Sequence, residues 1–251
     1  MWPIAIAGHL KQRLESPALV AARLSVCLAR LADLDPLFTG WVRGGMRHRS
    51  AVPRVITLPP DEVELRTWIV ENAIFESREG RKQHLGYSLN ARTSHRNPIR
   101  ADFWLSWVPS DHWFRSRIGI TIFDGQGPSP SSETDTPVKS LKEVLCGALT
   151  TLGTAWECES AGVVPGDYGS KEELPLKYES GWMVYLDQSP ARHLGDMRDI
   201  IAEKLANNAL LLTATSDTKF DPHNPVHWAA AVRIQSALAP LNERRKRSTE
   251  R

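Results

Sequence analysis

Apolar residues recur at helical spacing in five stretches of the chain. The clearest stretch begins at Ser16-Pro17, because a serine side chain can cap the first free amides and proline suits the first helical position. Apolar residues then return every three or four positions to about residue 34, and Asp35-Pro36 ends the helix. The same spacing predicts further helices over 61–75, 138–153, 196–206 and 225–238.

Six shorter stretches have the character of strands. In the first of them Leu85, Tyr87 and Leu89 alternate with polar or small residues. The predicted strands cover 84–91, 102–108, 117–123, 155–161, 181–187 and 209–215. Short polar links separate the first three strands, so we expect an antiparallel meander there. The segment 42–60 is rich in Arg, Gly and Pro and is predicted to be a loop.

Helix followed by strands occurs twice, on either side of a segment at 125–137 that is dense in Ser, Pro and Gly. The order predicts an α+β fold in which antiparallel sheets are flanked by helices. We expect one domain over 1–251, with two similar lobes at about 1–124 and 138–241 joined by a linker at 125–137. A basic tail at 242–251 is expected to be disordered.

Hydropathy and cysteine content both favour a cytoplasmic protein. No apolar run approaches the ~18 residues of a membrane helix, and no basic stretch precedes the short apolar segment after Met1. Cys27, Cys146 and Cys158 show no CxxC spacing and fall within predicted elements. Buried, reduced thiols are therefore expected, as in a reducing compartment.

The formal net charge of +2 is the balance of three unequal segments. Residues 1–125 carry a net charge of +5, residues 126–242 a net charge of −6, and the tail at 243–251 a net charge of +3. An acidic second half indicates a basic partner, because complementary potentials speed association and set its register.

Two groups of residues could carry metal-dependent chemistry. Asp221, His223 and His227 offer ligand types, but Asn224-Pro225 starts a helix between the two histidines, so they need not share a face. Asp217-Thr-Lys219 resembles the acid-x-lysine element of restriction-type nucleases but follows its strand and has no second acid on the strand before it. Neither group favours catalysis over a structural role.

Motifs for other chemistries are absent from the sequence. There is no GxSxG elbow, P-loop or GxGxxG, and nothing marks a cysteine as a nucleophile. We therefore expect a binding protein that has no catalytic activity and needs no cofactor or metal. Among nine tryptophans, Trp104, Trp107 and Trp113 cluster near one strand end, as aromatic residues do at interaction surfaces, although most tryptophans are expected in the core.

Several segments between about 17 and 241 together resemble a family of bacterial polymorphic-toxin immunity proteins, immunity protein 52. They are the leucine-rich stretch from Ala21 to Phe38 and Trp41, the strand after Trp156, the strand Gly181-Trp-Met-Val-Tyr-Leu, and the run from Thr215 through Phe220-Asp-Pro-His-Asn-Pro-Val-His-Trp. The resemblance implies an α+β fold and a role beside a toxin of restriction-endonuclease fold delivered by type VI secretion. It supplies no catalytic residues.

The expected function is that of an antitoxin: stoichiometric binding of a cognate nuclease toxin, with no direct nucleic-acid or membrane binding. The acidic second half supplies the expected contacts, which crowd one polar stretch: Glu157, Glu159, Asp167, Tyr168, Glu172, Glu173 and Glu179. Two alternatives stay open. One is a nucleic-acid-binding module that uses the basic first half and its arginine loop at 43–54, and the other is a metal-dependent hydrolase built on Asp221, His223 and His227.

Overall fold

The computed structural model describes residues 3–11, 13, 15–44, 55–57, 60–78, 81–93, 99–107, 116–124, 139–165 and 181–249. Its helices are α1 (Pro17–Leu34), α2 (Glu62–Glu71), α3 (Leu141–Ala155), α4 (Gln188–Ala191) and α5 (Pro225–Thr249), with a short 3-10 helix η1 (Pro36–Phe38). The strands are β1 (Ile4–His9), β2 (Trp41–Gly44), β3 (Ala73–Arg78), β4 (Arg81–Thr93), β5 (Ile99–Trp107), β6 (Ser116–Asp124), β7 (Ser160–Pro165), β8 (Met183–Leu186), β9 (Ile201–Lys204) and β10 (Leu210–Thr213).

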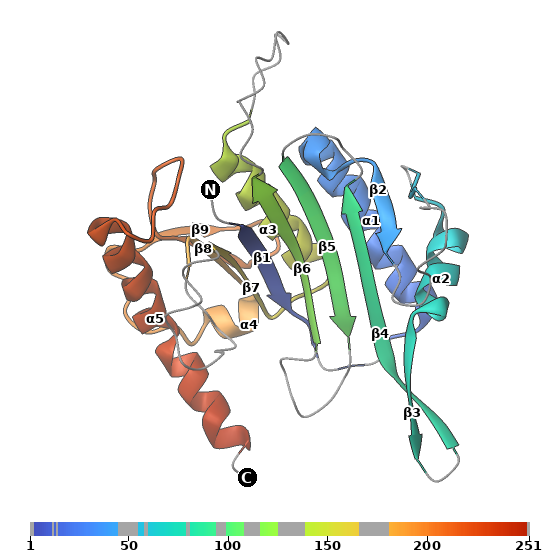
Figure 1. Ribbon diagram of the computed structural model, residues 1–251. Helices are drawn as coiled ribbons and strands as arrows, with labels where there is room; N and C mark the ends of the chain where they lie inside the picture. Colours follow the sequence, from blue (N-terminus) through green and yellow to red (C-terminus); the bar gives the residue numbers. More distant parts are fainter. Residues whose placement is uncertain are drawn as a thin grey trace, which may run out of the picture.

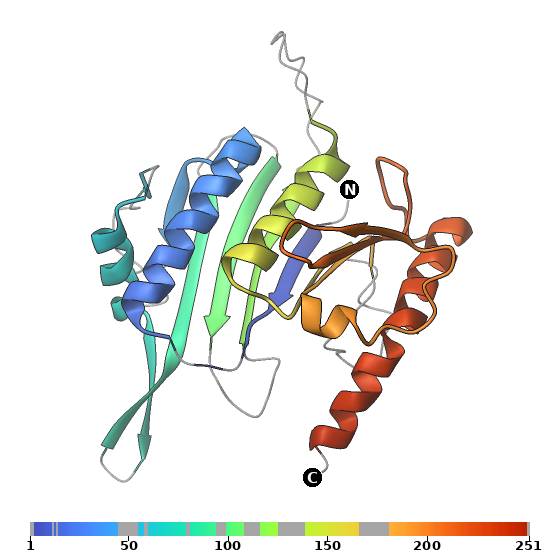
Figure 2. The same ribbon diagram turned by 180° about the vertical axis from the view of Figure 1, so that it is seen from behind.

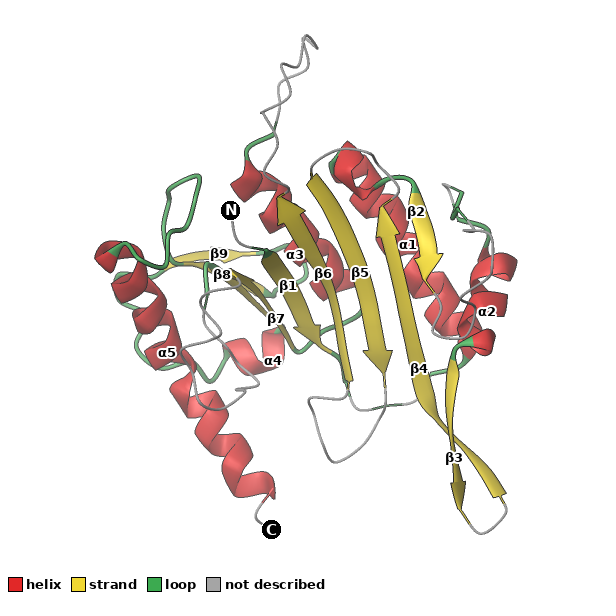
Figure 3. Ribbon diagram, in the orientation of Figure 1, coloured by secondary structure: helices red, strands yellow, loops and turns green. Residues whose placement is uncertain are grey.

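The strands form one antiparallel sheet in the order β2-β4-β5-β6-β1-β7-β8-β10-β9, with β3 paired to β4 beside this path (Figure 1). The predicted α+β class with a meander of β4, β5 and β6 is confirmed (Figure 3). The sheet is continuous across the predicted linker, because β6 and β7 both pair with β1. No helix within the described residues is long and apolar enough to cross a membrane.

Helices α1 and α3 cover one face of the sheet, as the view from behind shows (Figure 2). Leu24, Leu28 and Leu31 of α1 are fully buried, as are Leu145 and Leu149 of α3. They belong to a core that also includes alternate residues of the central strands. Each completely buried leucine contributes roughly 1.5–3 kcal/mol relative to leaving it in water.

Helix α5 packs on the opposite side of β8 and β10. Val184, Leu186 and Leu212 form a second, smaller core with Ile234 and Leu238 of this helix. Strand residues next to them along the chain, such as Tyr185 and Leu211, belong to the first core. Successive side chains of a strand point to opposite faces, so the last strands are covered on both sides whereas α5 leaves the central strands uncovered.

The N-terminal strand β1 was not among the predicted strands, yet it lies in the middle of the sheet. Its short sequence Ile4–His9 contains only two strongly apolar side chains, Ile4 and Ile6, and both point to the first core. A six-residue run that contains two alanines and a glycine carries little local strand signal. Its place is decided by pairing with strands more than 100 residues away in sequence.

Three other predictions were wrong in the first half and around α3. The predicted loop at 42–60 contains β2, whose Trp41 is fully buried. The predicted helix at 61–75 ends at Glu71, and 73–78 form β3. The predicted strand at 155–161 begins later, because α3 extends to Ala155 and β7 starts at Ser160.

The largest error concerns 196–206, predicted as a helix. Residues Ile201–Lys204 form the edge strand β9, and all four are exposed. Pairing with β10 outweighs the weak helical pattern there. The last helix is also longer than predicted, since α5 runs to Thr249, past Leu238 and into the predicted tail, where residues of high helix propensity follow one another.

Candidate functional site: the uncovered face of the sheet

The central strands present one face to which no described helix contributes a covering layer (Figure 1). On this face the side chains of β4 and β5 are polar or aromatic at alternate positions, whereas the positions between them are buried in the first core. The open face, as we call it, consists of Ser88, Asn90, Arg92, Arg100, Asp102, Trp104, Ser106, Arg117, Thr121, Phe123, Ala5, Ala7 and His9.

The ring of Trp104 lies against Gly119 of β6 on the open face. A Cβ atom added to Gly119, its partner on β6, would come within 2.4 Å of the indole ring. The glycine therefore makes room for the tryptophan, which stays half-buried. Aromatic side chains held rigidly on a surface lose little entropy on binding and are enriched where proteins contact one another.

A second aromatic residue of the open face, Phe123 of β6, lies opposite Arg100 of β5. The guanidinium carbon of Arg100 is 4.6 Å from the centroid of the Phe123 ring, which is the geometry of a cation–π contact. Because Arg100 is exposed, it can be contacted from solvent while it remains on the ring.

The charged groups of the open face are mostly positive. Arg92, Arg100 and Arg117 stand on β4, β5 and β6, against the single carboxylate of Asp102. Asp102 lies directly opposite Arg92 in the register. Its Oδ1 atom is buried and has no hydrogen-bond partner among the described residues.

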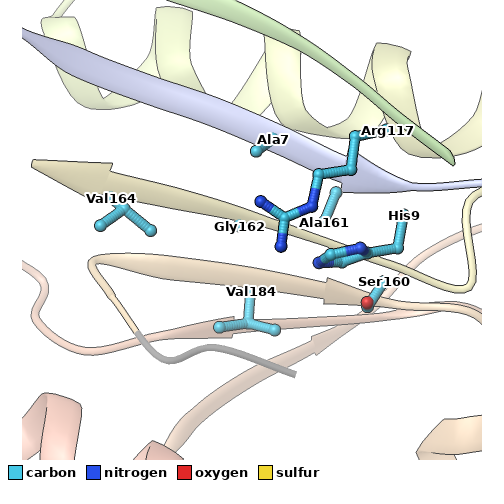
Figure 4. Close-up of a pocket in the computed structure, with 8 residues that line it drawn as sticks. All are labelled: Ala7, His9, Arg117, Ser160, Ala161, Gly162, Val164 and Val184. Carbon is cyan, nitrogen blue, oxygen red and sulfur yellow. The ribbon is translucent and has the colours of Figure 1, made fainter. Parts of the chain in front are cut away.

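A pocket opens where this face meets the edge of the region that α5 covers. It is partly open to solvent and is lined by Ala7, His9, Arg117, Ser160, Ala161, Gly162, Val164 and Val184. In Figure 4 the guanidinium of Arg117 and the ring of His9 point to the same end of the pocket, close to the hydroxyl of Ser160. Figure 4 also shows Val164 at the other end, with Val184 between Val164 and Ser160.

Glu157, one of the predicted toxin contacts, forms ion pairs with other residues of the protein. Its carboxylate accepts hydrogen bonds from Arg13 at 2.7 Å and from Arg23 at 3.0 Å, and Glu15, which is almost fully buried, accepts from the same two arginines. The hydrogen bond from Arg13 is the main reason why the pKa of Glu157 falls from 4.5 to about 2. This network ties the chain before α1 to the turn after α3.

The other predicted contacts do not gather around this network within the described part of the chain. Glu159 is half-buried, and its main chain bonds to His9 and to Asp187. Asp167, Tyr168, Glu172, Glu173 and Glu179 lie outside the described residues. The acidic stretch stays a prediction.

The two histidines considered as metal ligands in the alternative hydrolase hypothesis are held by other contacts. Nδ1 of His227 accepts a hydrogen bond from the amide of Asp221 at 3.0 Å, so the proton is on Nε2, which donates to Asp217 at 2.7 Å. The Asp221 carboxylate accepts from the amide of His223. No group of three His, Cys, Asp or Glu side chains within the described ranges is arranged to hold a metal ion.

Burial accounts for two of the three cysteines and for most described tryptophans, whereas Cys146 is half-buried. Cys27 and Cys158 are completely buried, and loss of solvent raises the pKa of the Cys27 thiol to about 12. Five tryptophans are in the core, as expected: Trp41, Trp68, Trp107, Trp156 and Trp182. Of the predicted interaction cluster, Trp107 is buried, Trp104 lies on the open face, and Trp113 is outside the described residues.

The open face was missed at the sequence level although a signal for it exists. In β5, Arg100, Asp102, Trp104 and Ser106 alternate with apolar residues, and the same period recurs in β4. Such alternation predicts a strand with one face away from the core. It does not say which strands lie side by side, and the pocket depends on β1 lying between β6 and β7.

Comparison with known proteins gives little at the level of sequence. No protein family matches the chain, and no curated protein matches it. Among solved structures, the chain is similar to "Pseudomonas aeruginosa T6SS protein PA0821", with a TM-score of 0.49 and 10% identity over 94% of this chain and 73% of that protein. A distant structural neighbour of this chain is thus a T6SS protein.

Proposed function

We propose that the protein is an antitoxin of the immunity type, which binds a nuclease toxin of a type VI secretion system and neutralises it in a stoichiometric complex. The observation that carries the proposal is the open face, where the half-buried Trp104 and the exposed Arg100 stand on a sheet that is packed on its other side. Tryptophan and arginine are the residues that most often dominate the energy of protein interfaces.

The charge of this face indicates which part of a toxin it would cover. Three arginines against one aspartate favour a negatively charged surface. Nucleases that use metal ions gather carboxylates at their active sites. An arginine-rich face could therefore cover the acidic active-site cleft, which differs from the expectation that an acidic surface of this protein binds a basic partner.

The proposal is tested by rescue from toxicity. The test expresses the nuclease domain of a candidate toxin from the same gene neighbourhood in sensitive bacteria, with and without the protein. We expect the wild type to restore growth, and Trp104→Ala and Arg92→Glu to restore it less. A charge reversal at Arg233, exposed on α5, is the matched control and should rescue fully. Equal survival with and without the gene would refute the proposal.

The acidic stretch is tested by measuring the affinity of the purified protein for the same toxin domain. Reversal of Glu159, Glu172 and Glu173 together is expected to weaken toxin affinity if these residues contact the toxin. Glu157 is left unchanged, because its loss would also break the ion pairs with Arg13 and Arg23. An unchanged dissociation constant at low salt assigns recognition to the open face alone.

A second candidate function is binding of single-stranded nucleic acid. Trp104 and Phe123 lie on the open face of an antiparallel sheet among arginines, and sheets of this kind can stack bases on aromatic rings. A shift of labelled single-stranded DNA or RNA that weakens steeply with salt, and that Trp104→Ala abolishes, would favour this function over the first.

A further inference from the structure

The polar end of the pocket is built by one row of residues across three strands. The register places Arg117 of β6 and Ser160 of β7 on either side of His9 of β1. Side chains that lie opposite one another in adjacent strands point to the same face, and Figure 4 shows the three groups converging. His9 and Ser160 are both more than nine-tenths buried.

The next row on the same face forms the apolar part of the pocket. Ala7, Gly162 and Val184 are aligned across β1, β7 and β8. The alanine and the glycine leave space in front of the sheet, Val164 lines the end away from Arg117, and Val184 lies between Val164 and the polar groups (Figure 4). A ligand that fills this pocket must therefore have a short apolar part next to a polar head.

We propose that this pocket is the subsite for the side-chain carboxylate of an aspartate or glutamate presented by a protein partner. The proposal rests on the proposed function and names the partner group that the open face recognises. A guanidinium binds a carboxylate through two parallel hydrogen bonds, and the Ser160 hydroxyl and the His9 ring stand beside it. The methylene groups of the acidic side chain would contact Ala7, Val164 and Val184.

The pocket suits a carboxylate of a protein better than the phosphates of a nucleic acid. Arg117 is the one arginine or lysine among the described residues that line the pocket, whereas a protein that binds along a nucleic-acid backbone needs a run of cations. The apolar end also matches methylene groups rather than sugar hydroxyls. His9, Arg117 and Ser160 already make contacts in the free protein, so the ligand must add to these contacts or replace them.

The test uses the isolated full chain and a small probe, N-acetylglutamate amide, followed by NMR. We expect saturable shifts at the amides of Ala7 and Gly162 and at the Arg117 side chain, with a dissociation constant on the order of 1 mM. The uncharged isostere N-acetylglutamine amide should leave these signals in place. Absence of a carboxylate-specific shift at the pocket would overturn the proposal.

Variants show whether the pocket itself binds the probe. Arg117→Met is expected to weaken binding about tenfold or more, whereas Arg100→Met, which removes an arginine of the same face outside the pocket, should not change it. If Arg117→Met does not fold, Ser160→Ala should weaken binding severalfold. Equal binding by the pocket variants and by Arg100→Met would refute the assignment.

Inorganic phosphate is titrated as an alternative ligand in the same NMR experiment. Tighter binding of phosphate than of the carboxylate probe at the same signals would overturn the carboxylate assignment in favour of a phosphate group. The result of the NMR titration can be interpreted independently of the result of the rescue assay. Rescue without a carboxylate-specific shift leaves the proposed function standing and refutes the pocket, whereas a shift without rescue refutes the function and leaves a carboxylate site.

Discussion

At the scale of residues, single side chains hold together parts of the chain that are far apart in sequence. Glu157 has a backbone φ of 50°, a conformation that non-glycine residues rarely adopt. Its carboxylate is fixed there by Arg13 and Arg23. A residue chosen at the sequence level as a partner contact therefore has an internal role, which only the contacts of the folded chain reveal.

The ion pairs of Glu157 predict a dependence of stability on pH. Because its pKa is lowered from 4.5 to about 2, the ionised carboxylate stabilises the fold fully above pH 4.5, and this contribution is lost as the pH falls toward 2. Glu157→Gln should lower the free energy of unfolding at pH 7 by about 1 kcal/mol, since the side chain is half exposed and screened by solvent.

Urea unfolding of both proteins at pH 7, 4.5, 3 and 2 checks this expectation. The difference between wild type and Glu157→Gln should shrink through the acid range. Glu203→Gln, on the exposed strand β9, is the control and should have little effect at any pH. A difference for Glu157→Gln that is the same at pH 7 and pH 2 would contradict the role of its ionised form.

Gly119 is the second residue whose role follows from a close contact. In Gly119→Ala the new Cβ would lie 2.4 Å from the Trp104 ring and 2.5 Å from the carbonyl oxygen of Ile6. We expect a loss of about 1–3 kcal/mol in unfolding free energy and a change in tryptophan fluorescence as Trp104 moves. At Gly195 the nearest atoms would be 3.5 Å away, so Gly195→Ala should be tolerated; similar effects at both sites would be evidence against the clash.

At the scale of elements, helix ends are well encoded and strand positions are not. Ser16 caps α1, as its sequence predicts, by accepting a hydrogen bond from the amide of Leu19. Ser140 and Glu143 form a reciprocal capping box at the start of α3. These signals are local, because the atoms involved lie within one turn of each other. Strand β9 carries no comparable local signal and was mistaken for a helix.

The capping box predicts a measurable contribution to stability. Ser140→Ala leaves an amide of the first turn without its acceptor and should lower the unfolding free energy by about 1 kcal/mol. Ser236→Ala, on the exposed side of α5, is the control and should be close to neutral, because alanine is favoured inside a helix. Equal losses in urea unfolding for the two variants would show that the cap has no special effect.

At the scale of the whole molecule, β1 joins the parts of the chain before and after 125–138. It pairs with β6 on one side and β7 on the other over all six of its residues. The most N-terminal segment therefore completes the core under α1 and α3. We expect both parts of the chain to unfold together.

Ile6→Ala tests this expectation, because Ile6 is fully buried at the centre of β1. Loss of its side chain should lower the unfolding free energy by about 2–5 kcal/mol. Hydrogen exchange should accelerate equally in β5 and in β8, which lie on opposite sides of β1. Val226→Ala, at an exposed position, should leave exchange unchanged, and acceleration confined to one side of β1 would contradict cooperative unfolding.

The sequence by itself determined the α+β class, the positions of α1 and α3, and the meander of β4, β5 and β6. These features depend on contacts between residues close in the chain, namely helical periodicity, capping and short links between strands. The central place of β1, the edge strand β9 and the internal use of Glu157 depend on partners distant in sequence. The tertiary structure alone decided them and the pocket at His9, Arg117 and Ser160, because strand order brings these side chains together and no local pattern encodes that order.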